Sequence, residues 1–179
     1  MDRSTVTGER LLLRPLTEAD RPALYRLWDE SSESRGAPRD TARAAGWREI
    51  SRPDHLNMAI VERSSGAFVG RIELRGTGHP LPELGIELSR AFRGRGYGSE
   101  AVRVFCAHLT ARRGAEPIRV RIREENHRSR RMFERLGAKY IGRSTYFSEE
   151  LLDTLRQTLP GALPAALTEP SILEYRLTL

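Results

Sequence analysis

The stretch that decides the fold is Glu83-Leu84-Gly85-Ile86-Glu87-Leu88-Ser89-Arg90-Ala91-Phe92-Arg93-Gly94-Arg95-Gly96-Tyr97-Gly98-Ser99. Its first part, 83–89, alternates polar and apolar residues, which is typical of a strand with one face on a core. Glycines and arginines follow at 93–98. Beyond Ser99, apolar residues recur at helical spacing as far as Gly114, which predicts a helix and its end. The order is strand, glycine turn, helix.

This glycine turn has the physical properties of a phosphate-binding loop. Glycine lets the backbone approach a ligand closely, and the free N–H groups of a helix start attract anions. The Walker pattern is absent, because Ser99 and Glu100 follow the last glycine. The dinucleotide pattern is absent too, because Gly98 comes only two positions after Gly96. The pattern Arg-x-x-Gly-x-Gly is satisfied by Arg93, Gly96 and Gly98.

Outward from this stretch, the chain alternates strand and helix signals. Apolar runs and alternation predict strands at 11–15, 56–62, 67–74, 83–89, 118–123, 139–146 and 172–177. Helical spacing and capping residues predict helices after Thr17, at 40–50, after the glycine turn and at 127–136, with a further helical stretch at 149–156. Loops are expected at 31–38 and 76–82, and 148–170 is an unusual insertion. The order predicts an α/β domain with an antiparallel front half.

Composition narrows the class of protein. A chain of 179 residues fits one domain, 1–179. No apolar run is long enough for a membrane helix, and the first ten residues lack an apolar signal segment, so we expect a cytoplasmic protein without a membrane partner. A single cysteine, Cys106, excludes an internal disulfide and a cysteine zinc cluster. The four histidines show no metal-binding spacing, so no metal is expected.

The net charge of +6 favours anionic partners, phosphates included. Only Lys139 among the 30 basic residues is lysine, a bias more typical of a GC-rich genome than of a binding site. No nucleic-acid-binding module or basic strip with stacking aromatics is visible, so nucleic-acid binding is not favoured.

Taken with its surroundings, the turn resembles that of the GNAT superfamily of N-acetyltransferases. More narrowly, the chain resembles the ribosomal-protein N-terminal (alanine/serine) acetyltransferase branch. The resemblance covers nearly the whole chain and is carried by residues 9–20, 84–88, the glycine turn, 126–129 and 135–138. It implies the GNAT fold: a mixed, mostly antiparallel sheet of about seven strands, splayed at the coenzyme site, with about four helices.

The resemblance also implies acetyl-CoA as cosubstrate and an amine as acceptor. The positions that match the family's coenzyme contacts are Leu88, Ser89, Arg93, Gly94, Arg95, Gly96, Tyr97, Gly98, Ser99, Asn126 and Ser129. The turn would hold the pyrophosphate, while Leu88 and Ser89 would line the pantetheine arm. Asn126 can equally be a simple helix N-cap, and the two roles are compatible.

Direct acyl transfer needs a base for the acceptor amine and a donor for the departing thiolate. Glu83 and Glu87 are the candidate bases, because alternation puts both on one face of their strand, and the resemblance does not choose between them. Many relatives carry a tyrosine acid where this chain has Phe133, which has no proton to give. Ser129, a backbone amide or water would then serve, or the thiolate would leave unassisted.

These expectations leave two functions open. The first is an acetyl-CoA-dependent N-acetyltransferase acting on a primary amine. The alternative, motivated by Phe133, is a catalytically weak GNAT-like module that binds acyl-CoA or a partner. The acceptor is open among protein N-termini, lysines, polyamines, aminoglycosides and small metabolites. The insertion at 148–170 could cap the acceptor side or mediate a homodimer.

Overall fold

A computed structural model describes residues 4–30, 39–147, 149–158 and 168–178. The predicted loop at 31–38 and much of the 148–170 insertion lie outside these residues. The described chain is α/β, with eight strands and five α-helices. The sequence and its family resemblance predict about seven strands and four helices. The short strand β1 (Val6–Thr7) is the additional strand, and the helical stretch in the insertion is a full helix, α5 (Glu149–Thr158).

The first of two compact units runs from the N-terminus to Ile118. Five strands follow one another in it, each antiparallel to the next. They are β1, β2 (Leu11–Pro15), β3 (His55–Glu62), β4 (Phe68–Arg75) and β5 (Glu83–Leu88). The strands predicted at 56–62 and 67–74 are confirmed and form an antiparallel pair, β3 and β4, whose turn ends at Gly66; its φ of +72° is left-handed and favours glycine.

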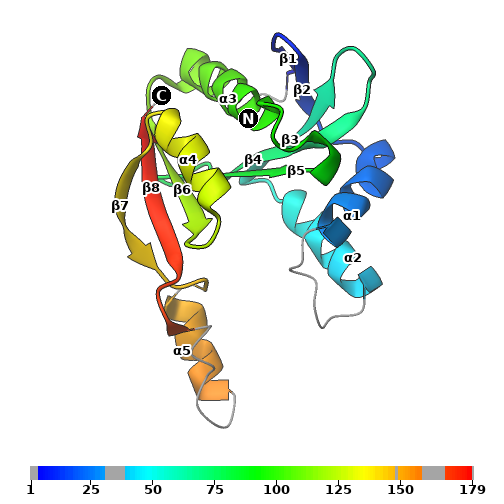
Figure 1. Cartoon of the computed structure of the whole chain (residues 1–179). Helices are drawn as coiled ribbons and strands as arrows, with labels where there is room; N and C mark the ends of the chain where they lie inside the picture. The colour runs from blue at the N-terminus through cyan, green and yellow to red at the C-terminus, as the bar shows by residue number, and fades with distance from the viewer. Residues whose placement is uncertain (1–3, 31–38, 148, 159–167, 179) are drawn as a thin grey trace. The chain divides into compact units, whose positions relative to one another are not determined.

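Helices cover both faces of these strands (Figure 1). On one side lie α1 (Arg21–Glu30) and α2 (Arg39–Ile50), and on the other lies α3 (Tyr97–Arg113). Leu24, Leu27 and Ile50 form a buried cluster under α1 and α2, with Trp28 and Trp47 packed against it. Both tryptophans therefore pack on the core.

The apolar side of α3 is buried as its spacing predicts. Ala101, Val102, Phe105, Cys106 and Leu109 are all buried, whereas Ala107 is exposed. Residue 107 lies two positions after Phe105, which turns it to the opposite side of a helix. The helix ends at Gly114, which has φ +80°.

The second unit spans Arg119–Thr178. Its antiparallel pair is β7 (Lys139–Ser144) and β8 (Ile172–Thr178), and most of β6 (Pro117–Arg123) belongs to it as well. The helix α4 (His127–Arg135) is joined to β8 through the Tyr175 hydroxyl, which donates to the Glu134 carboxylate at 3.0 Å. The predicted strands and the predicted helix at 127–136 are confirmed here.

Candidate active site

The glycine turn lies where the sequence places it, between β5 and α3. A short 3-10 turn, Arg90–Phe92, follows β5, and the chain then reverses through two left-handed glycines, Gly94 (φ +79°) and Gly96 (φ +81°). Gly96 is the N-cap of α3. Residues 93–96 are exposed, whereas Tyr97 and Gly98 are buried in the first turn of the helix. Residues 94 and 96 are glycine because a positive φ strains any residue that has a Cβ atom.

The turn leaves a set of backbone donors open. Within the described chain, no acceptor outside α3 is hydrogen-bonded to the N–H groups of Arg95, Gly96, Tyr97, Gly98 or Ser99. The first N–H groups of a helix have no acceptor inside it either. Together with the positive end of the helix dipole, they form an anion site. Two arginines, Arg93 and Arg95, add positive charge to the same segment.

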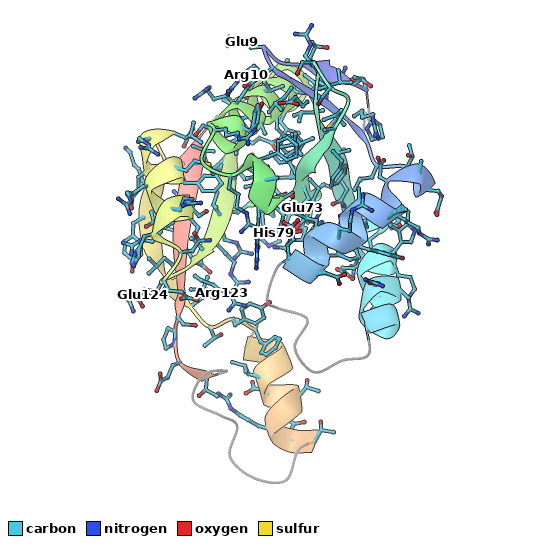
Figure 2. The ribbon with its side chains drawn as sticks, turned by 45° about the vertical axis from the view of Figure 1, so that its right-hand side comes forward. Glu9, Arg10, Glu73, His79, Arg123 and Glu124 are labelled. Atoms are coloured by element: carbon cyan, nitrogen blue, oxygen red, sulfur yellow. The ribbon has the colours of Figure 1, made fainter. Side chains whose placement is uncertain are left out.

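An arginine that is distant in sequence supports the turn. Arg10, next to β2 and labelled in Figure 2, donates from Nε to the Glu100 carboxylate at 2.8 Å and from Nη1 to the Arg95 carbonyl oxygen at 3.0 Å. Its guanidinium also lies over the Tyr97 ring, 4.6 Å from the centroid. Glu100 is buried and accepts from the backbone N–H groups of Arg10 and Leu11 as well. No local sequence pattern predicts this brace, because Arg10 and Glu100 lie 90 residues apart.

The Tyr97 hydroxyl is fixed in turn by Glu62 at the end of β3, to which it donates a hydrogen bond. That bond raises the pKa of Tyr97, because ionising the phenol would place two negative charges together. Hydrogen bonds from Ser65 and Tyr97 lower the pKa of Glu62. Tyr97 therefore anchors the turn as a neutral hydroxyl.

The geometry of the turn fits the coenzyme that the resemblance implies. A pyrophosphate needs several converging N–H donors and positive charge, and the turn offers both. A Cβ at Gly94 would meet nothing within 4 Å, and one at Gly96 would meet only Arg10 Nη2, at 3.3 Å. Arg95, Gly96, Tyr97, Gly98 and Ser99 would hold the pyrophosphate of acetyl-CoA, with Arg93 and Gly94 as neighbours.

The main chain at the end of β5 already has protein partners. Arg93 donates from Nε to the Leu88 carbonyl oxygen at 2.7 Å, and the Ser89 N–H donates to Val69 at 2.9 Å. The Ser89 hydroxyl donates to the Glu30 carboxylate at 3.0 Å. Glu30, at the end of α1, was not singled out from the sequence. The pantetheine contacts of Leu88 and Ser89 remain a prediction.

Both candidate bases project from β5 toward arginines of β4. Glu83 pairs in register with Arg75, and Glu87 pairs with Arg71. Each carboxylate makes an ion pair with its cross-strand arginine. The Glu83 side chain is 13% exposed and that of Glu87 is 36% exposed. Since residues 83 and 87 lie four positions apart in one strand, they share a face, as alternation predicts.

The second unit contains the remaining predicted site residues. Asn126 is the N-cap of α4, and its side-chain oxygen accepts from the Ser129 N–H at 3.1 Å. The capping role of Asn126 is thus confirmed, while coenzyme contacts of Asn126 and Ser129 remain predictions. Phe133 is buried, with 1% of its surface exposed.

Two further expectations concern the rest of the chain. Cys106 is buried, and burial raises the pKa of its thiol to about 12, so a structural role fits it better than a nucleophilic one. Among the described helices, none has the length and apolar character that crossing a bilayer requires.

Known proteins resemble this chain in both sequence and fold. The family model of the acetyltransferase (GNAT) domain matches residues 10–139. A crystal structure provisionally described as an acetyltransferase superposes with a TM-score of 0.73 at 22% identity, covering 99% of this chain and 88% of the other. A Vibrio cholerae protein provisionally described as a ribosomal-protein-serine acetyltransferase gives 0.70 at 16% identity, covering 100% of both chains.

A chimera of the spermidine N-acetyltransferase SpeG from Vibrio cholerae and hSSAT gives a TM-score of 0.72 at 14% identity, covering 95% of this chain and 96% of the other. At such identities the superpositions establish the fold alone. The family model covers most of the chain, including β2 to α4 and the glycine turn between them. This chain therefore belongs to the GNAT acetyltransferase family.

Proposed function

We propose that this protein is an acetyl-CoA-dependent N-acetyltransferase that acetylates a primary amine. The observation that carries the proposal is the glycine turn at the start of α3, with its left-handed glycines and unpaired backbone N–H groups, in a chain of the GNAT family. Acetyl-CoA, when bound, supplies the acetyl group as a thioester. The pyrophosphate is bound by the backbone N–H groups of residues 95–99, and the positive charge of Arg93 lies in the same segment.

Glu87 is the stronger of the two candidate bases. Its side chain is 36% exposed, whereas that of Glu83 is 13% exposed, so Glu87 is the more accessible to an acceptor or to a bridging water. The Glu87 carboxylate takes a proton from the acceptor ammonium. The freed nitrogen pair forms the bond to the acetyl carbon, the C–S bond breaks and its electron pair leaves with the sulfur. The nitrogen's second proton passes to solvent, and the thiolate is protonated.

Phe133 takes no part in proton transfer, since a buried phenyl ring has no proton to give. Ser129 stays the candidate donor to the departing sulfur, and a thiolate is a fair leaving group near neutral pH even without it. A catalytically weak acyl-CoA-binding module is the alternative function. Turnover of any amine that is lost in Glu87→Gln or Glu83→Gln would exclude that alternative.

Calorimetric titration with acetyl-CoA tests the proposed coenzyme site. Gly96→Leu should weaken binding at least tenfold, because leucine is strained in this left-handed position and its Cβ would lie 3.3 Å from Nη2 of Arg10, the residue that braces the turn. Gly114→Leu is the control: it has nearly the same φ, +80° against +81°, at the other end of the same helix, although its ψ of 179° differs from the −4° of Gly96. Both variants should lose about 1–3 kcal/mol of stability, since a side chain is strained in either conformation, but only Gly96→Leu should lose affinity. Equal affinity in the two variants would contradict the assignment.

We propose protein N-termini and polyamines as the first acceptors to screen, by release of the free thiol. One similar structure is described as acting on a ribosomal protein and another on spermidine, and both acceptors carry primary amines. Peptides beginning with alanine or serine represent the ribosomal-protein branch. The single domain over 1–179, the homodimer and the cytoplasmic location remain predictions.

A further inference from the structure

A buried arginine lies directly behind the proposed base. Arg71, on β4, is 8% exposed and stands opposite Ala59 of β3 and Glu87 of β5. Burying a guanidinium is costly unless its charge is paired and its N–H groups are hydrogen-bonded. The surroundings of Arg71 must therefore supply both.

Every N–H group of the Arg71 guanidinium has an acceptor. Nε and Nη2 donate to the two Glu87 carboxylate oxygens at 3.2 and 3.1 Å. Nη1 and Nη2 donate to the two Glu73 oxygens at 2.8 and 3.4 Å, and Nη1 also donates to Asn57 Oδ1 at 3.1 Å. Burial alone would lower the pKa of Arg71, but the carboxylates of Glu87 and Glu73 raise it above its usual value. The guanidinium is a permanent cation.

Arg71, Asn57, Glu73 and Glu87 form one hydrogen-bonded group, called the clamp below. The clamp is anchored to the fold through Asn57 and Glu73. The Asn57 amide donates from Nδ2 to the Ile50 carbonyl oxygen at the end of α2, at 2.8 Å. Glu73 lies on β4, opposite Gly85 of β5, and is labelled in Figure 2. A Cβ added at Gly85 would come within 2.7 Å of the Glu73 carboxylate. Glycine at 85 therefore leaves the room that Glu73 needs. Asn57 and Glu73 are both buried, so the network is rigid where it joins the fold.

The two carboxylates bound by Arg71 differ in what they can reach. The Glu73 side chain is 7% exposed, and that of Glu87 is 36% exposed. Arg71 grips the Glu87 carboxylate with two parallel N–H donors, an arrangement that sets its orientation as well as its place. The other candidate, Glu83, pairs with Arg75, whose side chain is 44% exposed, whereas that of Arg71 is 10% exposed.

We propose that Arg71 is a positioning residue that orients the Glu87 carboxylate toward the acceptor amine. The inference rests on the proposed function, and it adds a reason why Glu87 and not Glu83 acts as the base. Lysine cannot replace Arg71 in this role, because one ammonium is a point charge without the planar fork that grips both oxygens. Its effect should appear in the proton-transfer step and not in binding of the coenzyme.

Steady-state kinetics with an amine found in the thiol-release screen test the inference. Arg71→Gln should lower kcat roughly 10- to 100-fold, because a misplaced base costs about that much, with KM for acetyl-CoA within threefold of wild type. The double variant Arg71→Gln/Glu87→Gln should be no slower than Glu87→Gln alone, since a positioning residue has no effect once the group it positions is gone. Arg71→Lys should lose kcat as well, although it keeps the charge.

Arg14→Gln is the matched control. Arg14 also forms a two-donor grip on a carboxylate, with both Nη atoms 2.7 Å from the Asp20 oxygens, but outside the clamp. Arg14→Gln should lose stability, less than Arg71→Gln because the Arg14 side chain is 32% exposed and that of Arg71 only 10%, with kcat unchanged. Should Arg71→Gln fail to fold, Arg71→Lys carries the test. The inference is overturned if the folded Arg71 variants keep wild-type kcat, or if the losses at positions 71 and 87 multiply. Failure of the proposed function is a different result: a wild type that binds no acetyl-CoA and acetylates no amine, which removes both.

Discussion

Two glycines fit β4 and β5 together. Gly70 lets the two backbones come close, and Gly85 leaves room for the Glu73 side chain. A Cβ at Gly70 would lie 2.0 Å from the Glu87 carbonyl oxygen and 2.9 Å from the Leu88 Cα. Real Cβ atoms do not come so close to backbone, so the strands would have to move apart. Since Glu87 and Leu88 lie at the end of β5, this close contact helps set the position of both.

Gly70→Ala should therefore destabilise the protein by about 1–3 kcal/mol, the usual effect of overpacking. Gly78→Ala is the control, because a Cβ there meets nothing within 4 Å and its φ is not left-handed. Urea unfolding of both variants measures the difference. Equal midpoints for Gly70→Ala and Gly78→Ala would show that the β4–β5 pair adapts without cost.

The junction between β2 and α1 shows how a single carboxylate organises an element boundary. Asp20 accepts from the Thr17 N–H at 2.8 Å, as the predicted capping pattern requires, and also from both Nη atoms of Arg14. Burial by itself would raise the pKa of Asp20, but the hydrogen bonds from Arg14 and Thr17 lower it below its ordinary 3.8. The sequence predicted Thr17 as the cap but not the partnership with Arg14.

Asp20→Asn should lower the free energy of unfolding by about 2 kcal/mol at pH 7, the usual effect of losing charged hydrogen bonds at a buried site. The pKa of Asp20 is lower in the folded than in the unfolded chain. Ionised Asp20 therefore stabilises the fold fully at any pH above its pKa in the unfolded chain. The difference between wild type and variant should shrink as the pH falls below about 3.8. Denaturant unfolding over a pH series measures it.

Asp153→Asn supplies the comparison for that series, because the Asp153–Arg156 pair on α5 is exposed. Exposed pairs contribute little to stability, so this variant should unfold like wild type at every pH. An Asp20→Asn deficit that stays constant down to low pH would mean that ionisation of Asp20 is not its source.

At the scale of the whole molecule, coenzyme binding should be visible as stability. A ligand that binds only the folded state at 100 times its Kd stabilises by about 2.7 kcal/mol. For a chain of this size that corresponds to a rise in Tm of roughly 5–10 °C. Differential scanning calorimetry with acetyl-CoA should show this rise for wild type and Gly114→Leu, and a rise at most about half as large for Gly96→Leu, because a tenfold weaker Kd roughly halves the stabilisation at the same concentration. An equal rise in all three would place the coenzyme away from the glycine turn.

Local pattern determined much of this protein. Alternation, helical spacing and glycine placement predicted the strands, the main helices and the turn between β5 and α3, because each depends on residues near one another in the chain. The cap at Asn126 and the shared face of Glu83 and Glu87 were predicted for the same reason. The short β1 and the full length of α5 were not, since brief or irregular segments carry little periodic signal.

Only the tertiary structure decided which distant side chains meet. Arg10 bracing the turn through Glu100, Glu30 reaching Ser89, and Arg71 joining Asn57 and Glu73 to Glu87 each link residues from separate elements. In a chain with so many arginines, composition cannot single out the ones that are buried and paired. The fold selects them: strand register places an arginine opposite a carboxylate, and burial removes the water that would otherwise screen the pair. The sequence therefore predicted the type of site, whereas the tertiary structure determined which residues support it.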